Sequence, residues 1–232
     1  MRDRRLAGLN SKRRIMGVVC AVALGLFMSA SAHATLLGLA GTLQTNPDLF
    51  AGNLSVGLSV AFSNGVLTVT GDTSDYTLPN GSGPDNVTAT TGGFTPGTFS
   101  LSAVIKTNGL LQSGSITISG AIDDLSIPAG VLLQGTITAF GFQGNASPTG
   151  DEFDFLFNIT GGSLAGAYGS VGGTLLHAGN TTFNGSFLSG FTNDGTGVAD
   201  TRAIPEPSSV LLVVMSLLGL CGVVRRVPLR KS

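Results

Sequence analysis

Three carboxylates lie close together in the sequence DEFD, at Asp151, Glu152 and Asp154. Glycoside hydrolysis needs two carboxyl groups about 5 to 10 Å apart, one of which its surroundings keep protonated. This stretch could supply such a pair, although acidic residues at the start of a strand are more often a solvated face. Residues 35–204 also contain no tryptophan that could form a platform for a sugar. A carboxylate-dependent glycoside hydrolase therefore stands third among the hypotheses for this chain.

Other catalytic groups are scarce between residues 35 and 204. Both cysteines, Cys20 and Cys221, lie in apolar runs near the ends of the chain, so this stretch has no thiolate nucleophile and no thiolate zinc ligand. Its one histidine is His177, and it contains neither a G-x-S-x-G elbow nor a G-x-x-x-x-G-K phosphate loop. We therefore expect a protein that is not an enzyme.

A loop rich in oxygen ligands offers a second kind of chemistry. The sequence GDTSDYTLPNGSGPDN (71–86) places Asp72, Asp75 and Asp85 among glycines that allow tight turns. Calcium takes six to eight oxygen ligands from carboxylates, amides and carbonyl groups. The spacing does not match an EF-hand, so a weak calcium site stands beside the favoured interpretation, a polar turn whose acids aid solubility. No other cofactor is indicated.

The charges divide the chain into an acidic middle and basic ends. Of the twelve Lys and Arg residues, only Lys106 and Arg202 lie within residues 35–204, against eleven acidic residues, so this stretch carries a formal charge of −9. Because such a body repels phosphate backbones, we expect no nucleic-acid partner.

The middle of the chain has the pattern of β-strands. In NLSVGLSVAF (53–62) apolar residues alternate with small or polar ones, and Asn64-Gly65 separates this run from VLTVT (66–70). Two such runs around Asn-Gly predict a hairpin, because both turn residues need positive φ. Further strands are expected at 98–105, 115–119, 133–142, 152–160 and 181–191.

This pattern predicts an all-β body, and no segment of it shows a sustained helical period. Nine to eleven short antiparallel strands favour a β-sandwich or jelly-roll, and a β-solenoid is the alternative. We place the body at residues 35–191. Residues 192–204 (TNDGTGVADTRAI) lack clear alternation and are expected to form a flexible stalk.

The N-terminal residues 1–34 have the three parts of an export signal. Six basic residues between Arg2 and Arg14 precede an apolar run, and Ala32-His33-Ala34 presents small residues where signal peptidase reads them. Cleavage after Ala34 would leave Thr35 as the new N-terminus. We therefore expect export through the inner membrane.

The C-terminal segment 205–232 is organised as a second signal. Residues 208–224 form a run of 17 residues without charge, which as a helix would extend roughly 26 Å at about 1.5 Å per residue. This is barely enough for one transmembrane helix. Arg225 and Arg226 follow, and the positive-inside rule keeps that end in the cytoplasm.

Pro205-Glu206-Pro207, the apolar run and Arg225-Arg226 together resemble the PEP-CTERM sorting signal of Gram-negative bacteria. The resemblance covers residues 204–231 only. It implies recognition by a membrane-embedded cysteine protease, an exosortase, with processing near the triplet. It also implies a transient inner-membrane intermediate and delivery to the cell surface or the extracellular matrix.

The first hypothesis is therefore a non-catalytic surface or matrix protein associated with exopolysaccharide in a biofilm. Its expected partners are the export machinery with its signal peptidase, the exosortase, the membrane and exopolysaccharide. The second hypothesis is a carbohydrate-binding, lectin-like adhesin.

Overall fold

A computed structural model describes residues 35–52, 57–147 and 150–204, and the unit that contains them begins at Ala34. Their regular structure is almost entirely β, as the alternation predicts. The two signals lie outside the described residues. They include Ala32 and Ala34 of the cleavage site, the triplet Pro205, Glu206 and Pro207, and the pair Arg225 and Arg226.

Within the described residues the strands form one antiparallel sheet. Their bounds are β1 (Asp48–Ala51), β2 (Ser59–Ser63), β3 (Val66–Thr77), β4 (Asp85–Asn86), β5 (Gly97–Ile105), β6 (Leu111–Ile122), β7 (Ile127–Ser147), β8 (Gly150–Gly161), β9 (Val171–Ala178), β10 (Phe191–Thr192) and β11 (Val198–Ala203). Three short helical turns interrupt them, η1 (Leu39–Gly41), η2 (Asp123–Leu125) and α2 (Ala165–Tyr168).

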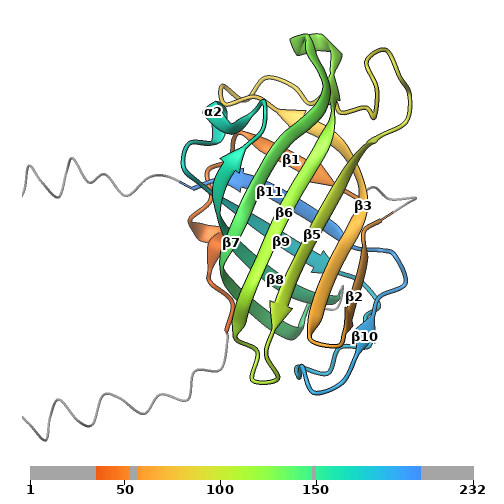
Figure 1. The fold of residues 1–232 in the computed structure, drawn as a ribbon, viewed down its shortest axis with the longest axis vertical. Helices are drawn as coiled ribbons and strands as arrows, with labels where there is room; N and C mark the ends of the chain where they lie inside the picture. Colours follow the sequence, from red (N-terminus) through yellow and green to blue (C-terminus); the bar gives the residue numbers. More distant parts are fainter. Residues whose placement is uncertain (1–34, 53–56, 148–149, 205–232) are drawn as a thin grey trace, which may run out of the picture. The chain divides into compact units, whose positions relative to one another are not determined.

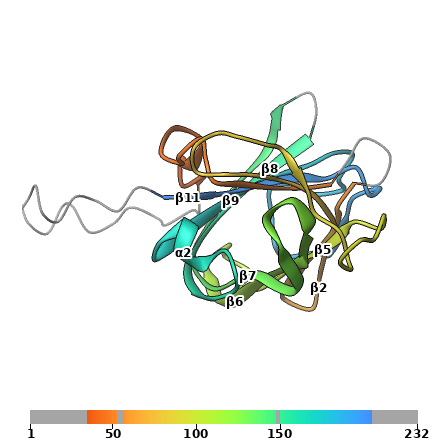
Figure 2. The same ribbon diagram turned by 90° about the horizontal axis from the view of Figure 1, so that it is seen from above.

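The sheet closes into an eight-stranded barrel, because β1 pairs with β11 on one side and with β3 on the other (Figure 1). Figure 2 shows β8, β9 and β11 on one side of the barrel and β5, β6 and β7 on the other. The sandwich or jelly-roll prediction is therefore wrong in its finer part, and so is the solenoid alternative. A sandwich needs two separate sheets packed face to face. Here successive long strands pair in chain order and coil until the first meets the last.

The hairpin at Asn64-Gly65 is confirmed. Both turn residues have positive φ, 52° at Asn64 and 79° at Gly65, and Ser63 pairs with Val66 across the turn. The strands expected from residues 66, 98, 115, 133 and 152 are also confirmed, within β3, β5, β6, β7 and β8. Of the run 53–62, the structure describes β2 at its end, while residues 53–56 lie outside the described part.

Two predictions near the C-terminus are wrong. Residues 192–204 are not a stalk, because β11 pairs with both β1 and β9 and closes the barrel. Its inward residues Ala199, Thr201 and Ala203 are buried but small or polar, so the alternation is weak in the sequence. Most of 181–191 is loop, and only Phe191 enters a strand.

Aromatic side chains pack inside one end of the barrel. Phe183 and Phe187 from the loop before β10 contact each other, and their rings also meet Phe142 of β7. Phe62, Phe140, Phe153 and Phe191 extend the same cluster. The loop that was expected to be a strand therefore closes this end of the barrel with its phenylalanines.

Glycines make room for the large rings. A Cβ at Gly135 of β7 or at Gly172 of β9 would clash with the ring of Phe157, which lies between them on β8. Small and large inward residues alternate around the barrel in this way, as dense packing requires.

An ion-paired triad lies on the outer face at the closing seam. Arg202 of β11 donates from Nε to Asp48 of β1 and from Nη2 to Asp200, each over 3.1 Å. Burial raises the pKa of Asp48 to about 6, against the lowering effect of Arg202, and the charge of Asp200 raises it further. The charged form of Asp48 is therefore paired with Arg202 at the seam, but it also carries a desolvation cost because the carboxylate is partly buried.

Candidate functional site

The three carboxylates of DEFD are divided between the two faces of β8, with Asp151 on one face and Glu152 and Asp154 on the other. Asp151 faces inward and accepts a hydrogen bond from the Thr181 hydroxyl over 2.6 Å. Glu152 faces outward beside His177, with Oε1 3.4 Å from Nδ1. Alternation along β8 places Asp151 and Asp154 on opposite faces of the sheet. Each of these groups thus has a partner within the fold.

Asp154 anchors the segment that follows the predicted cleavage site. We call residues 35–43 the N-terminal strap. The backbone N–H groups of Gly38 and Leu39 donate to Oδ2 of Asp154 over 3.1 and 3.4 Å. Burial raises the pKa of Asp154, while hydrogen bonds from the strap backbone lower it in part. Leu39 is buried beside Gly173, where a Cβ would contact it. Asp154 therefore holds the strap to the barrel.

The residues of the calcium hypothesis lie on two strands. Asp72 and Asp75 belong to β3, and Asp85 of β4 stands opposite Tyr76. Asp75 accepts a hydrogen bond from the Ser74 hydroxyl, and one buried oxygen of Asp85 has no hydrogen-bond partner in the described structure. No group of three or more His, Cys, Asp or Glu residues suited to a metal ion occurs among the described residues. The calcium site remains a prediction.

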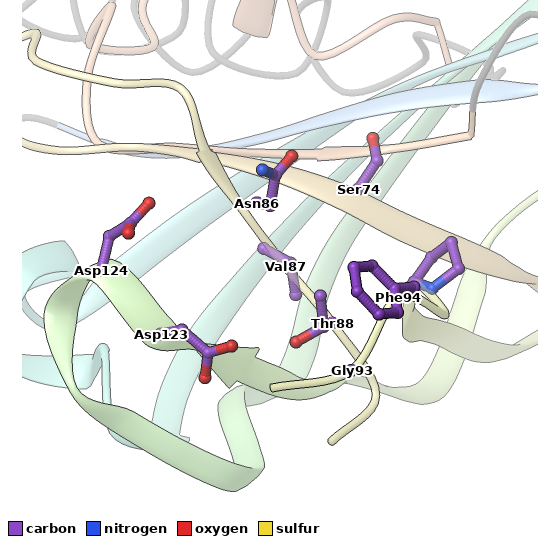
Figure 3. A pocket seen from close by; sticks show the side chains of 9 residues that line it. Ser74, Asn86, Val87, Thr88, Gly93, Phe94, Asp123 and Asp124 are labelled. Carbon is purple, nitrogen blue, oxygen red and sulfur yellow. The ribbon is translucent and has the colours of Figure 1, made fainter. Parts of the chain in front are cut away.

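The best candidate site is a cleft at the end of the barrel opposite the phenylalanine cluster. One wall is β4 with the loop that follows it, and the other is the turn between β6 and β7, which contains η2 (Figure 3). Thr88 joins the two walls, since it exchanges backbone hydrogen bonds of 2.9 and 2.6 Å with Ala121. The cleft has a volume of about 430 Å³, within the range of small-ligand sites.

The lining combines one aromatic ring with several polar groups. Phe94 is fully exposed, so its ring is accessible to a ligand in the cleft. Figure 3 shows it across the cleft from Asp123 and Asp124, with Val87 and Thr88 between them. Ser74, Asn86, Gly93 and Pro96 complete the lining.

Asp123 also divides this region into two hollows. Its Oδ2 accepts a hydrogen bond of 2.8 Å from the backbone N–H of Gly92, which ties the loop to η2. On the other side of this contact lies a second hollow of about 400 Å³, lined by Thr91, Gly92, Asp123, Ser126, Ile127 and Pro128. The two hollows are thus neighbours that share Asp123 in their linings.

The sequence contains little that would locate this cleft. Phe94 lies in the sequence GGFTPG, where an aromatic residue between glycines and a proline indicates an exposed ring on a loop. Its approach to Asp123 depends on the extension of β6 and β7, which local pattern does not predict.

No protein-family model matches the chain, and comparisons with curated proteins and with solved structures found no match. No helix among the described residues is long and apolar enough to cross a membrane, and the apolar run 208–224 lies outside them.

Proposed function

We propose that this chain is an exported, non-catalytic surface or matrix protein, processed by an exosortase and associated with exopolysaccharide. The observation that carries the proposal is the order of parts at the C-terminus: Pro205-Glu206-Pro207, an uncharged apolar run, and Arg225-Arg226. The export signal at the other end of the chain supports it.

The architecture of the body is compatible with release by cleavage near the triplet. Strand β11 ends at Ala203, and the N–H of Ile204 still donates to Val171 over 3.2 Å. The triplet begins at the next residue. A cut at or after Ile204 would leave every strand of the barrel intact, whereas a cut only a few residues earlier would remove part of the closing strand.

Mass spectrometry of the extracellular fraction tests this proposal. The expected product begins at Thr35 and ends between Ile204 and Pro207. Replacing the triplet by three alanines should retain the uncut chain in the membrane, while the Arg225→Lys/Arg226→Lys variant, which keeps both charges, should be released normally. A wild-type chain that stays in a stable membrane pool with its tail intact would refute the sorting proposal.

The second candidate function is a carbohydrate-binding adhesin, and the Phe94 cleft favours it. An exposed ring beside carboxylate, amide and hydroxyl groups provides both the stacking surface and the hydrogen-bonding groups that a sugar needs. Binding to a glycan array that disappears in the Phe94→Ala variant would support this function. A chelator would show separately whether calcium takes part.

A further inference from the structure

The charge around the cleft restricts what it can bind. Asp123 and Asp124 are both exposed in its lining, in a body with only two cationic side chains. Arg202 is held by Asp48 and Asp200 at the seam. Lys106 lies in the β5–β6 hairpin, which is at the opposite end of the strands. No cation of the described body is therefore available to balance the two carboxylates, and an anionic ligand would be repelled.

The exposed ring of Phe94 adds a second preference. The face of an aromatic ring carries partial negative charge and attracts cations, and it also packs well against the C–H face of a sugar. A sugar that carries a free amino group meets both conditions, and its ammonium can form charge-assisted hydrogen bonds with carboxylates.

The remaining groups favour a sugar chain over a basic peptide. Asn86 brings an amide to the lining of the first hollow, and the hydroxyl oxygens of Ser74 and Thr88, which donate to Asp75 and to the Thr90 carbonyl, can still accept hydrogen bonds from ring hydroxyls. A second hollow shares Asp123 with the first and offers room for a neighbouring sugar unit.

We propose that the cleft between the β4 loop and η2 binds a polysaccharide with free amino sugars, of the glucosamine type. Phe94 stacks on one ring, and Asp123 and Asp124 receive the ammonium groups. This inference deepens the adhesin function proposed above and depends on it for its biological setting.

The test is a titration of the full-length chain, purified in mild detergent, with four short oligomers. These are glucosamine, N-acetylglucosamine, galacturonic acid and lysine oligomers of equal length. The glucosamine oligomer should bind most tightly and weaken with added salt. Its acetylated form should bind several-fold more weakly, and the galacturonate oligomer should not bind.

Point variants locate the site. Phe94→Ala should weaken glucosamine binding about three- to tenfold, and Asp124→Asn about two- to fivefold. Asp124 is preferred to Asp123 because it makes no hydrogen bond or ion pair within the described residues, so its replacement leaves the loop anchored. The controls are Leu188→Ala, an exposed apolar residue near the phenylalanine cluster, and Asp194→Asn, an exposed acid before β11 that accepts hydrogen bonds from Asn180 and Thr196 and keeps one acceptor oxygen as asparagine. Both should bind as the wild type does.

Three results would overturn the proposal. Equal affinity for the acetylated oligomer would remove the role of the amino group. Equal affinity for the lysine oligomer, unaffected by Phe94→Ala, would mean attraction by charge alone. Absence of glucosamine binding would reject the ligand class. Because the titration uses purified chain, none of these results depends on whether an exosortase processes it.

Discussion

The N-terminal strap is held to the barrel by one carboxylate, and removing that carboxylate should release the strap. In the Asp154→Ala variant, the N–H groups of Gly38 and Leu39 lose their shared acceptor. Gly38 is exposed and can turn to water, whereas Leu39 is buried, so its N–H would remain without a partner. An unsatisfied buried donor costs about 1 to 3 kcal/mol.

The loss of stability in Asp154→Ala is limited, because the strap can detach from the barrel. Once the strap detaches, the variant forfeits the burial of Leu39, which contributes about 2 kcal/mol. We therefore expect Asp154→Ala to lower the free energy of unfolding by about 2 kcal/mol while the barrel itself persists. Asp154→Asn keeps an acceptor oxygen. Because burial already raises the pKa of Asp154 and so favours its neutral form, the asparagine should cost less than about 1 kcal/mol.

Hydrogen exchange separates strap release from a general loss of stability. In Asp154→Ala the amides of Gly38 and Leu39 should exchange freely, while amides of β5 and β6 remain protected. Glu152→Ala is the control, since Glu152 lies two residues away on the same outer face, pairs with the half-exposed His177 and makes no hydrogen bond to the strap within the described residues, although its charge acts on Asp154. It should change stability by less than about 1 kcal/mol. If Asp154→Ala and Glu152→Ala behave alike, the anchoring role of Asp154 is wrong.

Three other predictions concern the barrel. Asp48 has a pKa of about 6 in the folded chain against an ordinary 3.8, so the folded state keeps its proton to higher pH than the unfolded state does. The free energy of unfolding should therefore fall by up to about 3 kcal/mol as pH rises from 4 to 6. Urea unfolding should show this pH dependence in the wild type and lose it in Asp48→Asn, and an unchanged pH dependence would contradict the raised pKa of Asp48. Gly172→Ala should lower the free energy of unfolding by about 1 to 3 kcal/mol, because the added Cβ clashes with the ring of Phe157. Adding Phe157→Leu to this variant should recover part of the loss. If the losses of the two single variants simply add in the double variant, the clash is not the cause. The hydroxyl of Thr73 is fully buried and has no hydrogen-bond partner within the described part of the chain. Thr73→Val should therefore raise the melting temperature. A lower melting temperature would mean that the hydroxyl does have a hydrogen-bond partner.

Most predictions based on local pattern are confirmed, with the strand expected at 181–191 as the exception. The turn at Asn64-Gly65 depends on two adjacent residues that tolerate positive φ, and the strand around Phe99 and Leu101 depends on alternation that burial then follows. Such features are visible within a few residues, so the sequence alone predicts them. The all-β class follows from the same local signals.

Predictions that depended on distant contacts failed. Closure of the barrel requires β1 to pair with β3 and also with β11, about 150 residues further along the chain. The sequence predicts a stalk in place of β11 because the inward positions hold Ala199 and Thr201, which are small enough for the interior but give no apolar signal. Phe183, Phe187 and Phe191 are spaced by four, which in a strand would place all three rings on one face, but 181–190 form a loop and the rings pack together as a plug.

The position of the cleft follows from strands of unequal length. β5 stops pairing with β6 at Thr98 and Ser119, while β6 and β7 continue to pair as far as Ile122 and Ile127. The β6–β7 hairpin therefore extends beyond the end of β5. The segment that connects β3 to β5 pairs with β6 at Thr88 and Ala121, but the cleft next to this pair stays open. A concave surface arises wherever a closed barrel has one long hairpin beside a short strand, because the loop that spans the step cannot pack as densely as a strand. Phe94 lies on that loop and is fully exposed, so it adds nothing to the core. Replacing it should therefore change ligand binding in the proposed site without changing the stability of the barrel.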